Sequence, residues 1–506
     1  MAFNTLDFML LLAITLILYF VLPHRLRNPL LLIASYVFYA AYSLPLTLFL
    51  IVMTLITYFL ALEIQRRHND NEEKTTKYLM AVGVVICLGV LAFFKYFNFA
   101  FGMAGRVLGI EKPVRLNLIA PLGISFVVFT LVSYIVDVYR GTVPAEKNLL
   151  KYALFISFFP KVVQGPIEKA GDIIPQFDQR HSFDLMRFRE GMLMILYGLF
   201  MKMVVADTAC IAVDTIYGDI LSYSGASLLL ATLLFTFQIY CDFAGYSYIA
   251  IGAARVMGFD FRQNFRQPYL SLSVAEFWRR WHMSLNRWLI DYLYIPLGGS
   301  RCSRLRKDYN TLVTFGLSGL WHGAGFGYIM WGLVNGLYVI IESRCHDLVL
   351  KIRTNRSPSI MKQHPVAIFT AMKRFFRGAV TFALIVFSWI FFRAQSMSTS
   401  LEVLHRIFRE FNFNAFCSYI SGQLVNEEGA TLFGLDVSVS IPAFLICLLV
   451  VIVVDLIANK HNLVHAIASG HRAVRWTICF LLIFSVLILG VYGFGYNAGA
   501  FIYAGF

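Results

Sequence analysis

Runs of apolar residues long enough to cross a membrane recur along the whole chain. A helix of about 20 such residues spans the hydrocarbon core of a bilayer, and a helix satisfies its own backbone hydrogen bonds there. The runs lie at 6–22, 29–44, 45–62, 78–97, 118–138, 190–206, 226–251, 378–393, 439–458 and 476–496. We therefore predict an all-α, polytopic integral membrane protein with about 10–12 transmembrane helices.

The composition supports a membrane protein. Of the 506 residues, 58% are hydrophobic and 14% are charged, which would leave a soluble globule with a largely apolar surface. Composition does not shift along the chain, so we expect one domain over residues 1–506. The net charge of +14 is explained first by basic cytoplasmic loops, and we expect no nucleic-acid partner.

Loop charge gives the predicted helices an orientation. Segments 252–308 and 344–377 are rich in Arg and Lys, so the positive-inside rule places them in the cytoplasm. Segments 207–225 and 398–436 are acidic and are expected to be external loops. The expected location is the cell membrane, inner or plasma, with many passes through the lipid bilayer.

One histidine lies between two short apolar pieces. The cytoplasmic assignment of both flanking loops makes residues 310–341 enter the membrane and return, with a turn at Trp321-His322-Gly323-Ala324-Gly325. An ionisable residue at membrane depth is costly and marks a functional site by default. The alternative is an ordinary hairpin with His322 at the far interface. Residues 149–167, interrupted by prolines, a glycine and a lysine, are predicted to form a second re-entrant segment.

Residues 276–292 have helical spacing and a tryptophan-rich stripe. Its members are Trp278, Trp281, Leu285, Trp288, Leu289 and Tyr292. Tryptophan favours the membrane interface, so we predict an interfacial helix. Arg279 and Arg280 offer forked donors to the phosphates of an acyl donor, although contact with lipid headgroups is the simpler interpretation. By itself, His282 is typical of a structural interfacial histidine.

Motifs for metal or nucleotide chemistry are absent from the sequence. The eight cysteines contain no C-x-x-C pair, and the residue after His461 is Asn462 instead of the Glu of a zinc protease. The sequence has no Walker loop and no G-x-S-x-G nucleophile elbow. We expect no metal site and no bound cofactor.

Several motifs together resemble the membrane-bound O-acyltransferase family, and within it the branch of the alginate O-acetyltransferase membrane subunit. They are Gln238-Ile239-Tyr240-Cys241-Asp242-Phe243-Ala244-Gly245-Tyr246-Ser247, Asn264-Phe265-Arg266-Gln267-Pro268-Tyr269, Glu276-Phe277-Trp278-Arg279-Arg280-Trp281-His282, Asp291-Tyr292-Leu293-Tyr294-Ile295-Pro296-Leu297-Gly298-Gly299 and Gly319-Leu320-Trp321-His322-Gly323-Ala324. The similarity runs from the opening spans to the tail Phe501-Ile502-Tyr503.

The resemblance implies helices around a central funnel, with re-entrant and interfacial helices. It also implies that His322 is the catalytic histidine and that His282 is a second conserved polar position. The chain departs from the family at Tyr248, where Asp is frequent, and at Gln164, where Ala is common. Both departures bear on the identity of the acceptor or donor.

The chemistry of acyl transfer needs a base for the acceptor hydroxyl and donors for the oxyanion. Burial disfavours imidazolium, so we expect a neutral His322 that accepts the hydroxyl proton, while His282 positions or polarises the donor carbonyl. The candidate substrate-binding residues are Trp321, Arg279, Arg280, Asp242, Asn286 and Asp291.

Three classes of function remain open from the sequence. The first is transfer of an acyl group, expected to be acetyl, from acetyl-CoA or another acyl thioester, or from an acyl carrier protein on the cytoplasmic side. The acceptor is then an extracytoplasmic polysaccharide or a periplasmic or extracellular acetyltransferase. The second is D-alanyl transfer to teichoic acid, or acylation of lipid or protein, by the same fold. The third is a transporter or channel in which the histidine lines the pathway.

Overall fold

The structure is a computed structural model that describes residues 1–109, 116, 121, 123–354, 367–414, 416 and 441–492. All regular elements within these residues are helices, which confirms the all-α prediction. The aromatic tail at 501–503 and residues 417–436 of the predicted acidic loop lie outside the described residues.

The described residues form two compact units, with boundaries between Met203 and Val204, between Cys241 and Asp242, between Gln263 and Asn264, and between Leu463 and Val464. Unit 1 contains α1 (Leu6–Val21), α2 (His24–Ala40), α3 (Leu44–Asn69), α4 (Glu73–Val107), α5 (Ile124–Tyr139), α6 (Leu149–Ser157), α7 (Ala170–Ile173), η1 (Ile174–Asp178), α8 (Leu185–Leu199), the second part of α10 (Gly225–Val256), α19 (Leu463–Ser469) and α20 (Arg472–Leu489). Unit 2 contains α9 (Asp207–Gly218), η3 (Ile220–Ser222), the first part of α10, η4 (Pro268–Leu270), α11 (Val274–Arg280), α12 (Met283–Leu289), η5 (Ile290–Tyr294), α13 (Arg304–His322), α14 (Phe326–Thr354), α15 (Ala367–Ala394), α16 (Met397–Arg409) and α18 (Ile441–Ala458).

Many of these helices have the length and apolarity of membrane spans. Within the described residues seven helices qualify, or eight if the bent pair of α18 and α19 is one span. The apolar helices α1 and α5 are shorter. On α20, Leu481, Phe484 and Leu487 are each more than half exposed, as expected for side chains that face lipid. Each predicted run contains a helix, which confirms a polytopic membrane protein.

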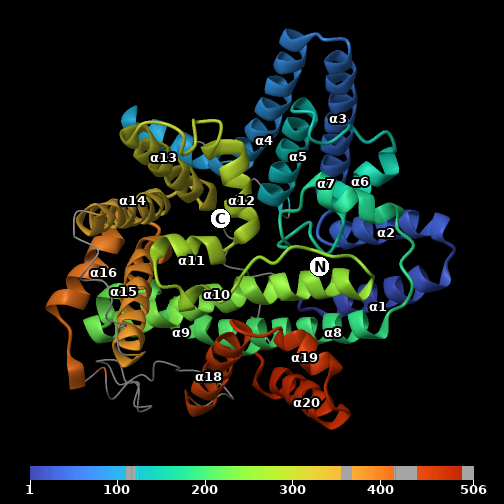
Figure 1. Cartoon of the computed structure of the whole chain (residues 1–506). Coiled ribbons are helices and arrows are strands. Elements are labelled where there is room, and N and C mark those ends of the chain that lie inside the picture. The colour runs from blue at the N-terminus through green and yellow to red at the C-terminus, as the bar shows by residue number, and fades with distance from the viewer. Residues whose placement is uncertain are drawn as a thin grey trace. The chain divides into compact units, whose positions relative to one another are not determined.

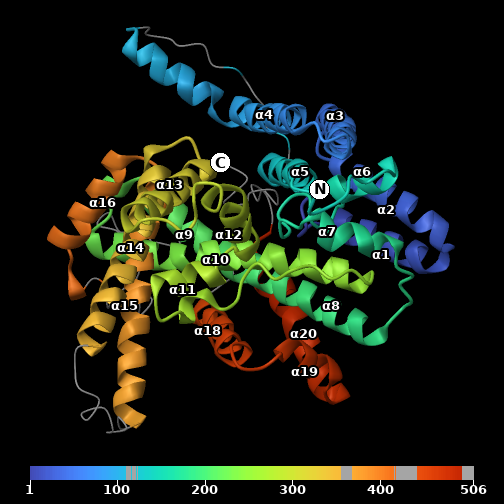
Figure 2. The same ribbon diagram turned by 45° about the horizontal axis from the view of Figure 1, so that its top comes forward.

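In unit 1, helices α3, α4 and α5 pack side by side, as Figures 1 and 2 show. Helix α5 begins after Gly123, whose φ of +66° is a left-handed conformation that favours glycine. A Cβ atom at Gly123 would also overlap the backbone of Val162. The segment after α6 therefore lies directly against the start of α5.

That segment, residues 158–169, is the second predicted re-entrant piece. The structure shows turns there instead of a continuous helix. Lys161 and Glu168 are both buried, and the Lys161 ammonium lies 4.5 Å from the centroid of the Phe155 ring. Glu168 Oε1 accepts a hydrogen bond of 2.6 Å from the backbone N–H of Arg262. The prolines and glycine thus interrupt the helix as predicted, whereas its depth in a bilayer stays a prediction.

Helices α8 and α10 approach each other at four glycines in unit 1. A Cβ atom on Gly198 would lie 2.6 Å from the carbonyl oxygen of Gly245, and one on Gly252 would lie 2.6 Å from that of Gly191. Since such distances are shorter than any ordinary contact, only glycine permits this backbone approach. Small residues at helix contacts are typical of membrane proteins.

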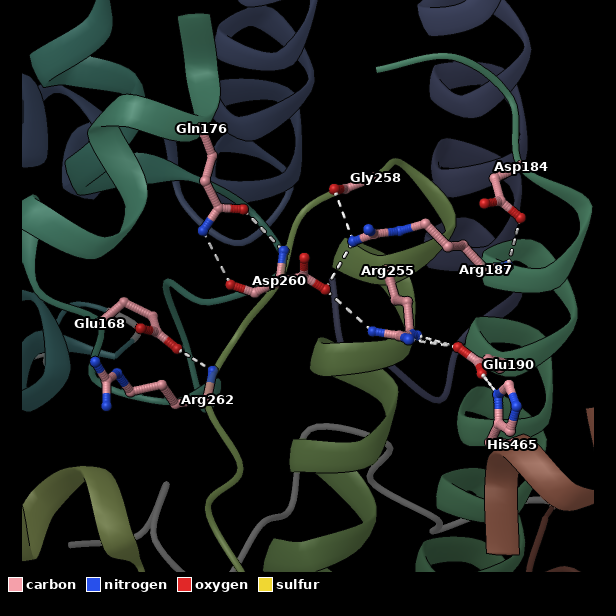
Figure 3. A network of polar contacts seen from close by, with 10 residues as sticks. All are labelled: Glu168, Gln176, Asp184, Arg187, Glu190, Arg255, Gly258, Asp260, Arg262 and His465. Atoms are coloured by element: carbon pink, nitrogen blue, oxygen red, sulfur yellow. Dashed lines mark hydrogen bonds and ion pairs between the residues drawn. The ribbon is translucent and has the colours of Figure 1, made fainter. Parts of the chain in front are cut away.

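A network of charged side chains joins the ends of α8 and α10 with α19 (Figure 3). Glu190 accepts from Arg255 Nε at 2.6 Å and lies 2.7 Å from His465 Nδ1. Asp260 pairs with Arg187 at 2.7 Å and with Arg255 at 3.0 Å. The network thus ties the start of the basic segment 252–308 to α8 and α19.

The predicted acidic loop 207–225 is largely helical, which corrects the prediction. Its first twelve residues form α9, which continues from a π-helix at Phe200–Ala206. Ala209, Ala212, Val213 and Ile216 recur at helical spacing and are buried. Of the three aspartates that suggested a loop, Asp207 and Asp214 lie within α9 and Asp219 directly follows its last residue.

In unit 2, α13 and α14 form a helical hairpin, and α15 packs against α14 (Figure 2). The turn at residues 323–325 is the predicted one. The second arm is longer than the sequence suggested, because α14 has 29 residues and its part Phe326–Lys351 qualifies as a span. A Cβ atom at Gly319 or Gly332 would overlap the backbone of the opposite helix, so these glycines allow the two arms to pack closely.

Candidate active site

His322 is the last residue of α13 and lies in an aromatic cluster of unit 2. Its side chain is buried, with a relative exposure of 3%. The centroid of its ring lies 4.7 Å from that of Trp321, 5.0 Å from that of Trp331 and 5.1 Å from that of Phe392. The predicted histidine is therefore enclosed by aromatic rings from three helices.

Five of the chain's seven tryptophans belong to this cluster. Trp331 stacks on Trp389 with centroids 5.6 Å apart and an interplanar angle of 18°. Trp278 lies 5.4 Å from Trp331, and Trp281 lies 5.2 Å from Trp389. Rings of this size exclude water and so strengthen electrostatic interactions inside the cluster.

The predicted interfacial helix over 276–292 is wrong as a single helix. It is interrupted at His282, which has a left-handed φ of +41°, so α11 ends before this residue and α12 begins after it. The N–H of Met283, which follows the break, donates to the carbonyl of Asn264 at 2.8 Å. Trp281 is 2% exposed, so the protein and not the lipid headgroups surrounds it.

The break places the His282 side chain beside Asn264. His282 Nδ1 lies 3.3 Å from Asn264 Oδ1, which also accepts from Ser284 Oγ at 2.7 Å. Because an amide oxygen only accepts, Nδ1 carries the hydrogen. Burial lowers the pKa of His282 from 6.5 to about 3, so the ring is neutral at physiological pH and the lone pair is on Nε2.

The two predicted histidines meet at one ring. Trp321 lies 4.7 Å from His322 and 6.2 Å from His282, measured between ring centroids. The Phe265 ring stacks on the His282 imidazole, with the two ring centroids 6.5 Å apart. The structure thus brings His282, Trp321 and His322 together, although they come from two separate parts of the sequence.

The predicted arginines differ in their surroundings. Arg280 pairs with Glu276 at 2.6 Å and donates to Asn459 Oδ1 at 3.0 Å. Arg279 is exposed, and within the described residues it makes no ion pair or hydrogen bond. Of the two guanidinium groups, that of Arg279 is therefore the one open to an external anion.

Two further candidates have structural contacts. Asn286 Nδ2 donates to the carbonyl of Trp278 at 2.9 Å, which ties α12 to α11 across the break. Asp291 is partly exposed and lies 3.9 Å from Arg287 one turn earlier. Their predicted role in orienting substrate stays a prediction.

Asp242 belongs to unit 1, whereas the two histidines belong to unit 2. Its carboxylate forms a 2.7 Å ion pair with Lys202, and both side chains are about 3% exposed. Lys202 lies in the π-helix that follows α8, a type of helix that often marks functional sites. Lys202 was not among the predicted residues, although it is a charged residue within an apolar run.

Asp455 was also missed. It is buried in the apolar helix α18 and accepts from the Tyr240 hydroxyl at 3.0 Å. The sequence feature that could have identified it is a single carboxylate in an 18-residue apolar helix, because an ionisable residue within a membrane helix is a candidate functional residue. The Tyr240 ring lies 6.1 Å from Trp281, so this pair borders the aromatic cluster.

Comparison with known proteins shows the family of the chain. The model of the membrane-bound O-acyltransferase family matches residues 31–372. A Pseudomonas aeruginosa protein named "Probable alginate O-acetylase AlgI" is 37% identical over 433 residues, covering 85% of this chain and 77% of its own length. The peptidoglycan O-acetyltransferase of Helicobacter pylori is 29% identical, with 92% of each chain covered.

A more distant relative is the teichoic acid D-alanyltransferase of Bacillus subtilis, 27% identical over 50% of this chain and 71% of its own length. The family match covers most of the chain and includes His282, His322 and the tryptophans around them, except Trp389. The chain belongs to the membrane-bound O-acyltransferase family and is an acyltransferase of the multi-span membrane type.

Proposed function

We propose that this protein transfers an acetyl group from a cytoplasmic thioester to hydroxyl groups of an extracytoplasmic polysaccharide, or to an external transferase that completes the transfer. The observation that carries the proposal is the 3% exposed His322 within its cluster of aromatic rings. Two relatives that cover 85% and 92% of the chain are named as O-acetylating enzymes, which supports acetyl as the group. The proposed location is the cell membrane, where both substrates are accessible.

The reaction starts at His322. The imidazole takes the proton of the acceptor hydroxyl while the oxygen forms a bond to the thioester carbonyl carbon. The carbonyl π electrons move to oxygen and give a tetrahedral oxyanion. Its collapse breaks the C–S bond, and His322 returns the proton to the departing thiolate. The step needs only these groups, so we propose that no bound cofactor takes part.

His282 has a different role in this proposal. With its hydrogen on Nδ1 directed to Asn264, the neutral ring offers only the lone pair of Nε2. An acceptor cannot polarise a carbonyl oxygen, which itself needs a hydrogen-bond donor. From the sequence, His282 was expected to position or to polarise the donor carbonyl. We propose the positioning role, in which Nε2 accepts a hydrogen bond from a hydroxyl or an amide N–H of the acyl donor.

Arg279 is the proposed contact for the acyl donor. Coenzyme A and acyl carrier proteins both present phosphate groups, for which an exposed guanidinium is a suitable partner. The basic segment 252–308 that contains Arg279 is the one expected on the cytoplasmic side. Because both classes of donor carry phosphate, the assay decides between them.

The test is acetyl transfer by the purified full chain in lipid nanodiscs. Radiolabelled acetyl-CoA and an acetyl-loaded carrier protein are supplied separately, with alginate oligosaccharides or peptidoglycan fragments as acceptors. His322→Ala is expected to lower the rate by about 100- to 10,000-fold, the usual contribution of a general base. The matched control is His461→Ala, since His461 is an exposed histidine outside the cluster.

Full activity of His322→Ala would exclude the mechanism. Absence of transfer by the wild type to any acceptor, with either donor, would exclude the proposed function. D-alanyl transfer is the second candidate, tested in the same assay with a D-alanyl carrier and teichoic acid. We rank it lower because the D-alanyltransferase relative covers half of the chain, whereas the O-acetylating relatives cover 85% and 92%.

A further inference from the structure

We propose that the indole N–H of Trp331 is the oxyanion donor of the active site, which makes Trp331 a catalytic residue. The inference rests on the proposed acyl transfer and deepens it. The N–H would hydrogen-bond the thioester carbonyl oxygen as that oxygen gains negative charge. Trp331 qualifies by its burial, by its uncommitted donor and by its contact with His322.

The first observation is an uncommitted donor. Trp331 is 1% exposed, and its Nε1 has no hydrogen-bond acceptor within the part of the chain that the structure describes. Burying an indole N–H without an acceptor is unfavourable, so such a group calls for an explanation. In Trp278, by contrast, the indole N–H donates to Asn335 Oδ1 at 3.3 Å. The Trp389 N–H also lacks an acceptor within the described residues, but the Trp389 ring makes no described contact with His322, so position distinguishes the two indoles.

The second observation is position. The Trp331 ring lies 5.0 Å from the His322 ring, with the two planes at 86°. The oxyanion forms on a carbonyl whose carbon is bonded to the oxygen that His322 deprotonates. A donor that stabilises it must therefore lie next to His322, inside the water-excluding cluster. Trp331 meets both conditions.

The third observation is that three other polar side chains are unsuited to be the oxyanion donor. His282 offers an acceptor at Nε2, because its hydrogen is on Nδ1. The guanidinium group of Arg280 is held by Glu276. The amide of Asn335 is buried, with its Oδ1 bonded to Trp278 and its Nδ2 bonded to the carbonyl of Trp331. None of these three groups is an uncommitted hydrogen-bond donor, whereas the Trp331 N–H is one within the described residues.

The test replaces the N–H and keeps the ring. Incorporation of 3-benzothienylalanine at position 331 exchanges N–H for sulfur in a side chain of nearly the same shape. The matched control is the same exchange at Trp389, which is equally buried and also lacks an acceptor within the described residues, but makes no described contact with His322. Thermal unfolding confirms that both proteins fold, and steady-state kinetics with the thioester donor is then measured.

We expect kcat to fall by about 100- to 1,000-fold at position 331, with KM for the thioester changed by less than about threefold, because the hydrogen bond strengthens only in the transition state. At position 389 both parameters should stay within about threefold of wild type. Unchanged kcat at 331, or an equal loss at both positions, would overturn the assignment of Trp331 while leaving His322→Ala to judge the acyl transfer. An inactive wild type would overturn the proposed function itself, and this inference with it.

Discussion

The ion pair between Lys202 and Asp242 leads to a measurable prediction about stability. The two groups are 2.7 Å apart, and each side chain is about 3% exposed. Neither charge has access to bulk water, so removal of one partner leaves an uncompensated buried charge. Such a change costs about 3–5 kcal/mol in proteins. We therefore expect Asp242→Asn and Lys202→Met each to lower the free energy of unfolding by about this amount.

The double variant gives the decisive comparison. With both charges removed, the desolvation cost that the pair carried disappears as well, so replacement of a buried pair by neutral side chains is often nearly neutral. Lys202→Met combined with Asp242→Asn should thus recover most of the loss of either single change. The resulting coupling energy should therefore exceed the cost of either single change, which is about 3–5 kcal/mol.

The assay is unfolding of the purified chain by SDS titration in mixed micelles, followed by tryptophan fluorescence. The matched control is Asp214→Asn, because Asp214 also forms an ion pair of 2.7 Å, with Arg393, but its side chain is 61% exposed. That change should cost less than about 1 kcal/mol. Single variants as stable as the control, or strictly additive losses in the double variant, would refute the reasoning.

Two further predictions concern unit 2. Arg279→Ala should raise KM for the thioester donor several-fold with little change in kcat, because the exposed guanidinium contributes to binding and not to chemistry. Steady-state kinetics checks this, and an unchanged KM would remove Arg279 from the donor site. Because burial lowers the pKa of His282 from 6.5 to about 3, only the unfolded chain takes up this proton as the pH falls below 6.5. The free energy of unfolding should therefore fall, through His282 alone, by up to about 1.4 kcal/mol per pH unit as the pH is lowered from 6.5 to 4. His282→Gln should show a shallower loss in SDS titrations over this range, and an identical slope would contradict it.

The sequence predicted those elements that depend only on residues close together in the chain. Apolar runs predicted the helices, and Gly323 and Gly325 predicted the turn beside His322, because length and small residues determine both features. It also selected His282, Trp321 and His322, which the structure brings into one cluster. The enclosure of His322 by Trp331 and Phe392 depends on the packing of α13, α14 and α15, and no periodicity encodes such a contact.

The errors have physical causes as well. Helical spacing over 276–292 concealed the break at His282, because a left-handed residue and the Asn264 contact that accompanies it leave the apolar pattern unchanged. The substrate-binding role of Asp242 stays a prediction, but its ion pair with Lys202 could not be predicted, because the pair joins two apolar runs about 40 residues apart in sequence. Charge partners across such separations become visible only when the helices are placed together.

The glycines of α8 and α10 also limit how these two helices can move. Gly191 and Gly198 are seven residues apart, as are Gly245 and Gly252, so the pairs recur after two helical turns on both partners. Sliding by a single turn would drive side chains into the opposing main chain, where no rotamer relieves the overlap. The register of the two helices is therefore fixed, and we expect any motion of this pair to be a rigid displacement of both helices together.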